Sequence, residues 1–158
     1  MIPHSPTPVI TIPDEFLLAM GKVTVVWGVL ESIIDISLYK LGGFGNVDAR
    51  GAIMTAHMPF PQKMDVLEAL SKHLAPDYPH LAQFSSVKPL LKKAQEGRNR
   101  IAHGNWGYEN GVVSRGRATA RGQLKISVEP ITIAEIEAIL LDIHKAGIAV
   151  IDLVLKKR

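Results

Sequence analysis

Apolar residues recur every three or four positions along several stretches of this chain, which is the spacing of one face of an α-helix. The first stretch predicts a long helix that starts near residues 11–14, where Pro13 suits a first turn, and stops at Gly42-Gly43. Its predicted core stripe is formed by Phe16, Met20, Val23, Trp27, Leu30, Ile34, Leu38 and Leu41.

The same helix carries a second apolar line, which at 100° per residue lies roughly opposite Trp27. A helix that is apolar on two faces is either central in its domain or buried against another subunit. In a chain of only 158 residues we expect a partner subunit, and therefore a homodimer. The line comprises Leu18, Val25, Val26, Val29, Ile33 and Ile36.

Three further helices are predicted before and after a turn at residues 76–79. Residues 46–74 form two shorter helices that break at residues 58–61, with Pro61 at the start of the second. The next helix covers about residues 80–103, and Pro89 either bends it or marks a later start. Its stripe contains Phe84, Val87, Leu91, Ala94, Arg98 and Ile101.

A short β segment separates this helix from the last one. Asn110-Gly111 between apolar flanks is a strong hairpin signal, and the alternation over residues 123–128 predicts another strand that pairs back. Residues 115–122 are rich in arginine and glycine and are expected to form a mobile loop. A capping box, Thr132 to Glu135, opens the final helix.

The predicted fold class is therefore mainly α. We expect one domain over residues 1–158, an up-and-down bundle of four to five helices with a small β-hairpin insertion at residues 105–129. Residues 1–12, with three prolines among the first eight, are expected to form an extended arm.

Composition narrows the classes of function. The chain has no cysteine, which excludes disulfides, thiolate metal sites and a cysteine nucleophile, and fits a reducing compartment. The histidines lack metal-ligand spacing, so we predict neither a metal nor a cofactor. The N-terminus does not read as a signal peptide, and Glu31 and Asp35 interrupt the longest apolar run. The sequence thus predicts a cytoplasmic protein without a membrane span.

The net charge of +3 is unevenly distributed. Residues 92–125 contain eight lysines and arginines against two glutamates, a net charge of +6, and the rest of the chain sums to −3. Such a basic segment is typical of proteins with phosphate-rich partners, although a solvated basic loop has the same composition. The residues expected to contact RNA are Arg100, Arg115, Arg117, Arg121 and Lys125.

One motif within this segment has the chemistry needed to cut RNA without a metal. Arg98, Asn99 and His103 lie at the C-terminal end of the helix predicted over residues 80–103. Histidine can exchange a proton near neutral pH, arginine can stabilise a charged phosphorane, and asparagine can orient either. On an ideal helix, however, Arg98 and His103 are about 140° apart. A site that uses both needs a distorted helix end or two subunits.

This motif, an Arg-x4-His pattern on a late helix, resembles that of the HEPN superfamily. The opening helix, with Trp27-Gly28-Val29-Leu30-Glu31-Ser32, also looks like that of many bacterial members. The resemblance implies a homodimer with facing motifs, and a metal-independent endoribonuclease with Arg98 and His103 as catalytic pair and Asn99 as support. It further implies a toxin–antitoxin or defence system with a cognate antitoxin or other partner protein. His103 is followed by Gly104-Asn105 rather than by x-Tyr, which leaves the substrate open.

Two alternatives remain at this point. His103 could simply cap the last carbonyls of its helix, with the arginines complementing the helix dipole. Glu31 or Asp35 could then pair with Arg98 or Arg100 in a structural salt bridge. The protein would in that case be a catalytically inactive interaction module that binds a partner protein or nucleotide.

Overall fold

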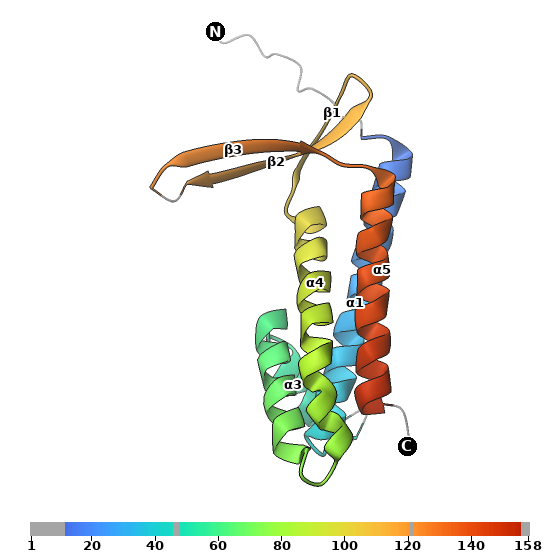
Figure 1. Cartoon of the computed structure of the whole chain (residues 1–158), viewed down its shortest axis with the longest axis vertical. Helices are drawn as coiled ribbons and strands as arrows, with labels where there is room; N and C mark the ends of the chain where they lie inside the picture. The colour runs from blue at the N-terminus through green and yellow to red at the C-terminus, as the bar shows by residue number, and fades with distance from the viewer. Residues whose placement is uncertain (1–11, 46–47, 121, 156–158) are drawn as a thin grey trace.

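The computed structural model describes residues 12–45, 48–120 and 122–155, and it is mainly helical with one small antiparallel sheet before the last helix (Figure 1). The elements in chain order are α1 (Asp14–Leu41), α2 (Ala49–Thr55), α3 (Phe60–Leu74), η1 (Pro79–Gln83), α4 (Phe84–Ala102), β1 (Asn105–Glu109), β2 (Val112–Ala120), β3 (Leu124–Pro130), α5 (Ile133–Val150) and η2 (Ile151–Leu155).

α1 confirms the helix expected from the apolar spacing. Acidic residues occupy its first turn and Lys40 its last, which complements the helix dipole at both ends. After Leu41 the chain turns through Gly43, whose φ of +77° favours glycine. The predicted stripe faces inward, with five of its members buried: Val23, Trp27, Leu30, Ile34 and Leu38.

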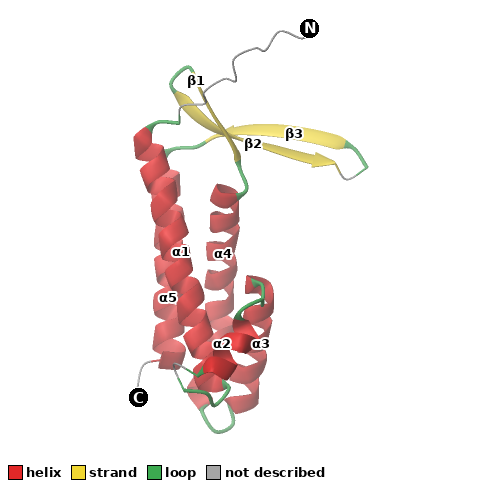
Figure 2. Cartoon of the chain, turned by 180° about the vertical axis from the view of Figure 1, so that it is seen from behind, coloured by secondary structure: helices red, strands yellow, loops and turns green. Residues whose placement is uncertain are grey.

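α1 and α5 lie side by side and run in the same direction (Figures 1 and 2). Near their N-terminal ends Leu18 lies in one groove with Ile136, and near their C-terminal ends Lys40 donates to the carbonyl of Val154. α4 packs on α5, where Gly97 lies directly against Ile139. These helices enclose the main core.

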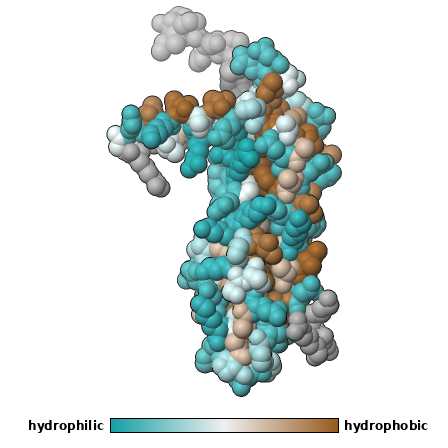
Figure 3. All heavy atoms as spheres, in the orientation of Figure 1, coloured by the Kyte–Doolittle hydropathy of each residue, from teal (hydrophilic) through white to brown (hydrophobic). Residues whose placement is uncertain are grey.

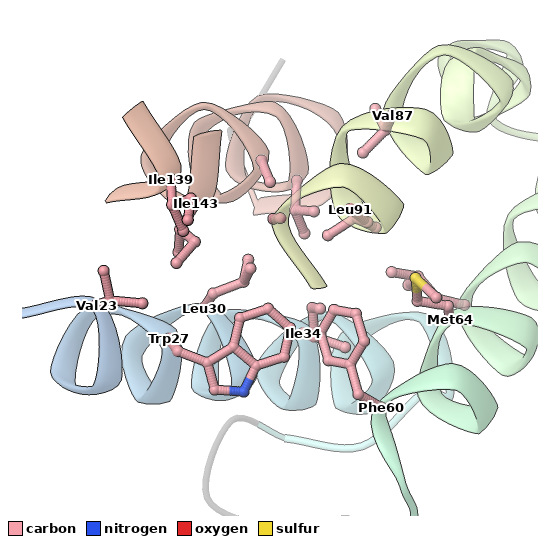
Figure 4. Packing of buried hydrophobic residues seen from close by; sticks show 14 of the residues in the cluster. Val23, Trp27, Leu30, Ile34, Phe60, Met64, Val87, Leu91, Ile139 and Ile143 are labelled. Atoms are coloured by element: carbon pink, nitrogen blue, oxygen red, sulfur yellow. The ribbon is translucent and has the colours of Figure 1, made fainter. Parts of the chain in front are cut away.

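α3 covers the C-terminal half of α1. The rings of Trp27 and Phe60 lie 4.5 Å apart between their centroids, and Figure 4 shows them beside Ile34. The Nζ of Lys63 lies 2.7 Å from Oδ1 of Asp35, in an ion pair between a buried lysine and a half-buried carboxylate. One of our sequence interpretations paired Asp35 with Arg98 or Arg100. In the structure Asp35 pairs with Lys63 instead.

The helix expected over residues 80–103 begins at Phe84, the first member of its apolar stripe, rather than at residue 80. Residues 79–83 form a 3₁₀ turn, and α4 starts at Phe84 with Pro89 inside it. Proline removes one backbone hydrogen bond from the helix. Burial of Phe84, Val87 and Leu91 on both sides of the proline offsets that loss.

The sheet has the order β1-β2-β3, and all its pairs are antiparallel. Asn110 and Gly111 both have positive φ, as the predicted tight turn requires. The prediction of a mobile loop over residues 115–122 is wrong for residues 115–120, which belong to β2 and pair with residues 124–129, and residue 121 lies outside the described residues. The result is a long two-stranded arm that extends away from the helices (Figure 1).

α5 opens with the predicted capping box. The Thr132 hydroxyl accepts a hydrogen bond from the backbone N–H of Glu135, and the Glu135 carboxylate accepts one from the backbone N–H of Thr132. Two orphan donors of the helix start are satisfied in this way.

α1 is, among the described residues, the one helix long and apolar enough to cross a membrane by length and composition. Its best window has a mean hydropathy of 1.7, and 22% of that window is buried. A core helix can pass the same test, so the expected absence of a membrane span and the cytoplasmic location stay predictions.

Candidate functional site

The C-terminal end of α4 is closed by side chains from the sheet. The backbone N–H of His103 donates to the carbonyl of Asn99 at 3.1 Å. Nη1 of Arg115 donates to the carbonyl of Arg100 at 3.3 Å. Nε1 of Trp106 donates to the carbonyl of Ile101 at 3.2 Å. These orphan carbonyls therefore have partners, and the imidazole of His103 is not needed to cap them.

Gly104 allows the sheet to approach the helix end this closely. A Cβ at this position would lie 2.6 Å from Cγ of Arg115 and 2.9 Å from Cε2 of Trp106. Such distances are well inside van der Waals contact, so any larger residue would displace the arginine or the indole. The glycine thus leaves room for Arg115 and Trp106 to pack against the helix end.

A cleft of about 560 Å³ opens between this helix end and the arm. His103 is exposed within it, and its side chain forms no hydrogen bond with any described residue. The structure brings together here five residues that the sequence proposed for RNA chemistry. The cleft is lined by Glu96, Asn99, Arg100, His103, Arg115, Arg117 and Glu129.

The arm has two chemically different faces. Side chains alternate along each strand, so Arg115, Arg117 and Thr119 point to the same face of the arm. Lys125 is paired with Thr119 across the strands and therefore lies on that face too. The opposite face is apolar and exposed. Figure 3 shows polar atoms on the side of the arm nearer the helices and apolar atoms on the other. The apolar face carries Ala118, Ala120, Leu124, Ile126 and Val128.

Two predicted RNA contacts do not line the cleft. Lys125 lies toward the tip of the arm, beyond Arg117 on the same face. Arg121 lies outside the described residues.

Arg98 lies on another side of α4. Its guanidinium carbon is 5.5 Å from the ring centre of Trp27 in α1, and its Nη1 donates to Oδ1 of Asn99 at 3.1 Å. Arg98 therefore lies against α1 whereas His103 lines the cleft, in keeping with the separation of about 140° expected on an ideal helix. Within one chain, Asn99 links the two: its side chain binds Arg98 and its carbonyl binds the His103 backbone.

Arg100 is held at the cleft by α5. Its Nη2 lies 3.5 Å from Oε1 of Glu135. The pKa of Glu135 is lowered, chiefly because the backbone N–H and hydroxyl of Thr132 donate to the carboxylate, and further by the nearby Arg100. The capping box thus also provides a counter-charge that orients Arg100.

Sequence reasoning did not place Glu96 and Glu129 in the site. Glu96 is one turn before Arg100 on α4, so helical spacing could have found it. Glu129 arrives through strand pairing, opposite Arg115 in the register of β2 and β3. No group of three or more His, Asp or Glu residues that could hold a metal was found within the described ranges.

Comparisons of this chain with protein-family models, curated proteins and solved structures found no match. The HEPN resemblance therefore rests on the motif and on the opening helix.

Proposed function

We propose that the cleft binds the phosphodiester backbone of RNA and cleaves it without a metal ion. The observation that carries this proposal is the exposed, uncommitted imidazole of His103 in a cleft that Arg100, Arg115 and Arg117 also line. Guanidinium groups match phosphate oxygens in a forked geometry, and histidine exchanges protons near neutral pH.

The lining residues supply each part of a transesterification. A carboxylate, Glu96 or Glu129, takes the proton from the ribose 2′-OH, and the 2′-oxygen attacks phosphorus. Arg115 and Arg117 stabilise the negative charge that accumulates on the phosphorane. The imidazolium of His103 gives its proton to the leaving 5′-oxygen, so the products are a 2′,3′-cyclic phosphate and a free 5′-OH.

Membership of the HEPN superfamily is part of the same proposal. It is supported by the Arg-x4-His motif at the end of α4 and by the mainly helical chain. An up-and-down order of five helices also gives the first and fifth the same direction, as α1 and α5 have.

Binding of RNA without cleavage is a second candidate, because one observation favours it. Arg98, half of the motif, stacks on Trp27 and points away from the cleft. In that case the basic cleft and arm would hold RNA or a nucleotide, and Arg98 would only join α4 to α1.

Incubation with mixed RNA in EDTA tests both candidates. We compare wild type with His103→Ala, Arg117→Ala and, as matched control, His57→Ala, an exposed histidine outside the cleft. Cleavage by wild type and His57→Ala, with a loss of about 100-fold or more in His103→Ala, supports the nuclease. Arg117→Ala should weaken binding and flatten its salt dependence by about 0.7 in log–log slope.

Other outcomes decide against each candidate. RNA binding that depends on Arg117, without cleavage by wild type, favours the second candidate. Absence of both binding and cleavage by the folded wild type overturns both.

A further inference from the structure

β3 is an edge strand with one apolar face. The sheet order is β1-β2-β3, so no described strand pairs with the outer edge of β3, and all seven of its residues are exposed. Its side chains Leu124, Ile126 and Val128 are between 66% and 70% exposed, and no charged residue lies between them on that face. Unpaired strand edges of this kind are where a further extended segment adds to a sheet.

One hydrogen bond fixes which backbone groups of β3 point outward. The backbone N–H of Ile131 donates to the carbonyl of Val113 at 2.9 Å, directly beyond the last register pair of β2 and β3. Hydrogen-bonded and non-hydrogen-bonded pairs alternate along an antiparallel ladder. The odd-numbered residues of β3 therefore bond to β2, and the N–H and C=O groups of the even-numbered residues point away from it.

Pro130 agrees with this phase. It is even-numbered, so its missing N–H falls on the outer edge, which is where a strand tolerates proline. The other even-numbered residues are Leu124, Ile126 and Val128, and among the described residues nothing hydrogen-bonds to their outward backbone groups. The free backbone groups and the bare apolar side chains thus belong to the same three residues.

The opposite face of the arm is positively charged. Arg115, Arg117 and Lys125 oppose the single carboxylate of Glu129 there, a net charge of +2. Ser127 lies between Arg117 and the outer edge, and its short side chain leaves the guanidinium a path toward a neighbouring strand. Opposite charges on adjacent strands stabilise their pairing, so acidic side chains fit on this face of an added strand.

The occupant that fits this edge comes from another protein. Residues 1–11 and 156–158 contain no aspartate or glutamate, so these segments of the chain do not supply the acidic side chains. A second copy of the arm would place two positively charged faces side by side, and like charges on neighbouring strands repel.

We propose that β3 binds an extended segment of a partner protein in which apolar residues alternate with acidic ones. Main-chain hydrogen bonds to Leu124, Ile126 and Val128 provide affinity, and the apolar residues of the segment cover the side chains of the same three residues. Its acidic residues lie beside Lys125 and Arg117. This inference does not depend on the proposed RNA chemistry.

Hydrogen exchange of the full chain, followed by NMR, tests the edge. The probe is a capped peptide as long as β3, seven residues, that alternates valine with glutamate, and its control carries lysine in place of glutamate. In the free protein the amides of Ile126 and Val128 should exchange faster than those of Ser127 and Glu129. Saturating glutamate peptide should slow exchange at Ile126 and Val128 by about 10-fold or more, because these amides gain partners.

Two variants test the side-chain and backbone contributions. Lys125→Glu should weaken binding of the glutamate peptide by about 5- to 20-fold and strengthen binding of the lysine peptide. Lys22→Glu, an exposed position on α1, is its matched control and should bind as wild type does. Ile126→Pro removes an outward N–H but no bond to β2, and should weaken binding by about 10-fold. Ile126→Thr keeps that N–H and should lose less.

Several outcomes overturn the proposal. These are equal binding of the two peptides, or unchanged exchange at Ile126 and Val128 with peptide at about 1 mM, the weak limit of specific binding. Slowing that grows with protein concentration in the absence of peptide would assign the edge to a second copy instead. Unchanged spectra of the helices show that a variant is folded. RNA cleavage in EDTA is measured on separate samples, so either proposal can fail without the other.

Discussion

The two ends of α4 are surrounded by different chemistry. Toward its N-terminus, Phe84, Val87 and Leu91 are buried among apolar side chains of other helices. At its C-terminus, Arg115 and Trp106 from the sheet close the last carbonyls, and charged groups line an open cleft. One helix therefore contributes to stability at one end and to chemistry at the other, and substitutions at the two ends should have separable effects.

The largest effect is expected in the core. Leu91→Ala removes a side chain with no exposed surface and should lower the free energy of unfolding by about 2–5 kcal/mol. Urea unfolding measures this loss, and the neighbouring Leu90→Ala, partly exposed, should cost less than half as much. RNA affinity per folded molecule should stay at the wild-type value. A loss of affinity in the folded fraction would show that core and cleft are coupled.

A smaller effect on stability, with a large effect on the cleft, is expected at Gly104. Gly104→Ala forces Arg115 and Trp106 to move and should cost about 1–3 kcal/mol while weakening RNA binding. Gly107→Ala is the matched control, because no described atom lies within 4 Å of the Cβ that it would add. Equal effects of the two substitutions would contradict the close packing at Gly104.

The smallest effect concerns Glu135. Its lowered pKa means that the charged carboxylate favours the folded state at neutral pH, and that this stabilisation is lost as the pH falls through its folded pKa. Unfolding free energies measured from about pH 7 to about pH 3 should therefore depend less on pH in Glu135→Gln than in wild type. Glu109→Gln, on an exposed strand position, should retain the wild-type dependence.

Local patterns predicted much of the helical structure. The three-four spacing around Trp27 placed the buried face of α1, and the pair Thr132 and Glu135 placed the start of α5. Each of these signals depends on residues within a few turns of one another. The Asn110-Gly111 turn belongs to the same class.

The parts that sequence reasoning missed depend on pairing between distant segments. Residues 115–120 alternate arginine with small residues and have no strand signal of their own. They form a strand because they pair with β3. Glu129 enters the cleft through the same register. The position of Arg98 could be anticipated only as an angle, because its contact with Trp27 requires α1 and α4 to be packed together.

The pairing of α1 with α5 joins the first and the last helix of the chain. During synthesis, α1 leaves the ribosome before its neighbour exists, and both of its apolar lines are then bare. Contacts between such distant segments slow folding, and uncovered apolar surface attracts other chains. We therefore expect a long-lived nascent intermediate that depends on chaperones until α5 emerges.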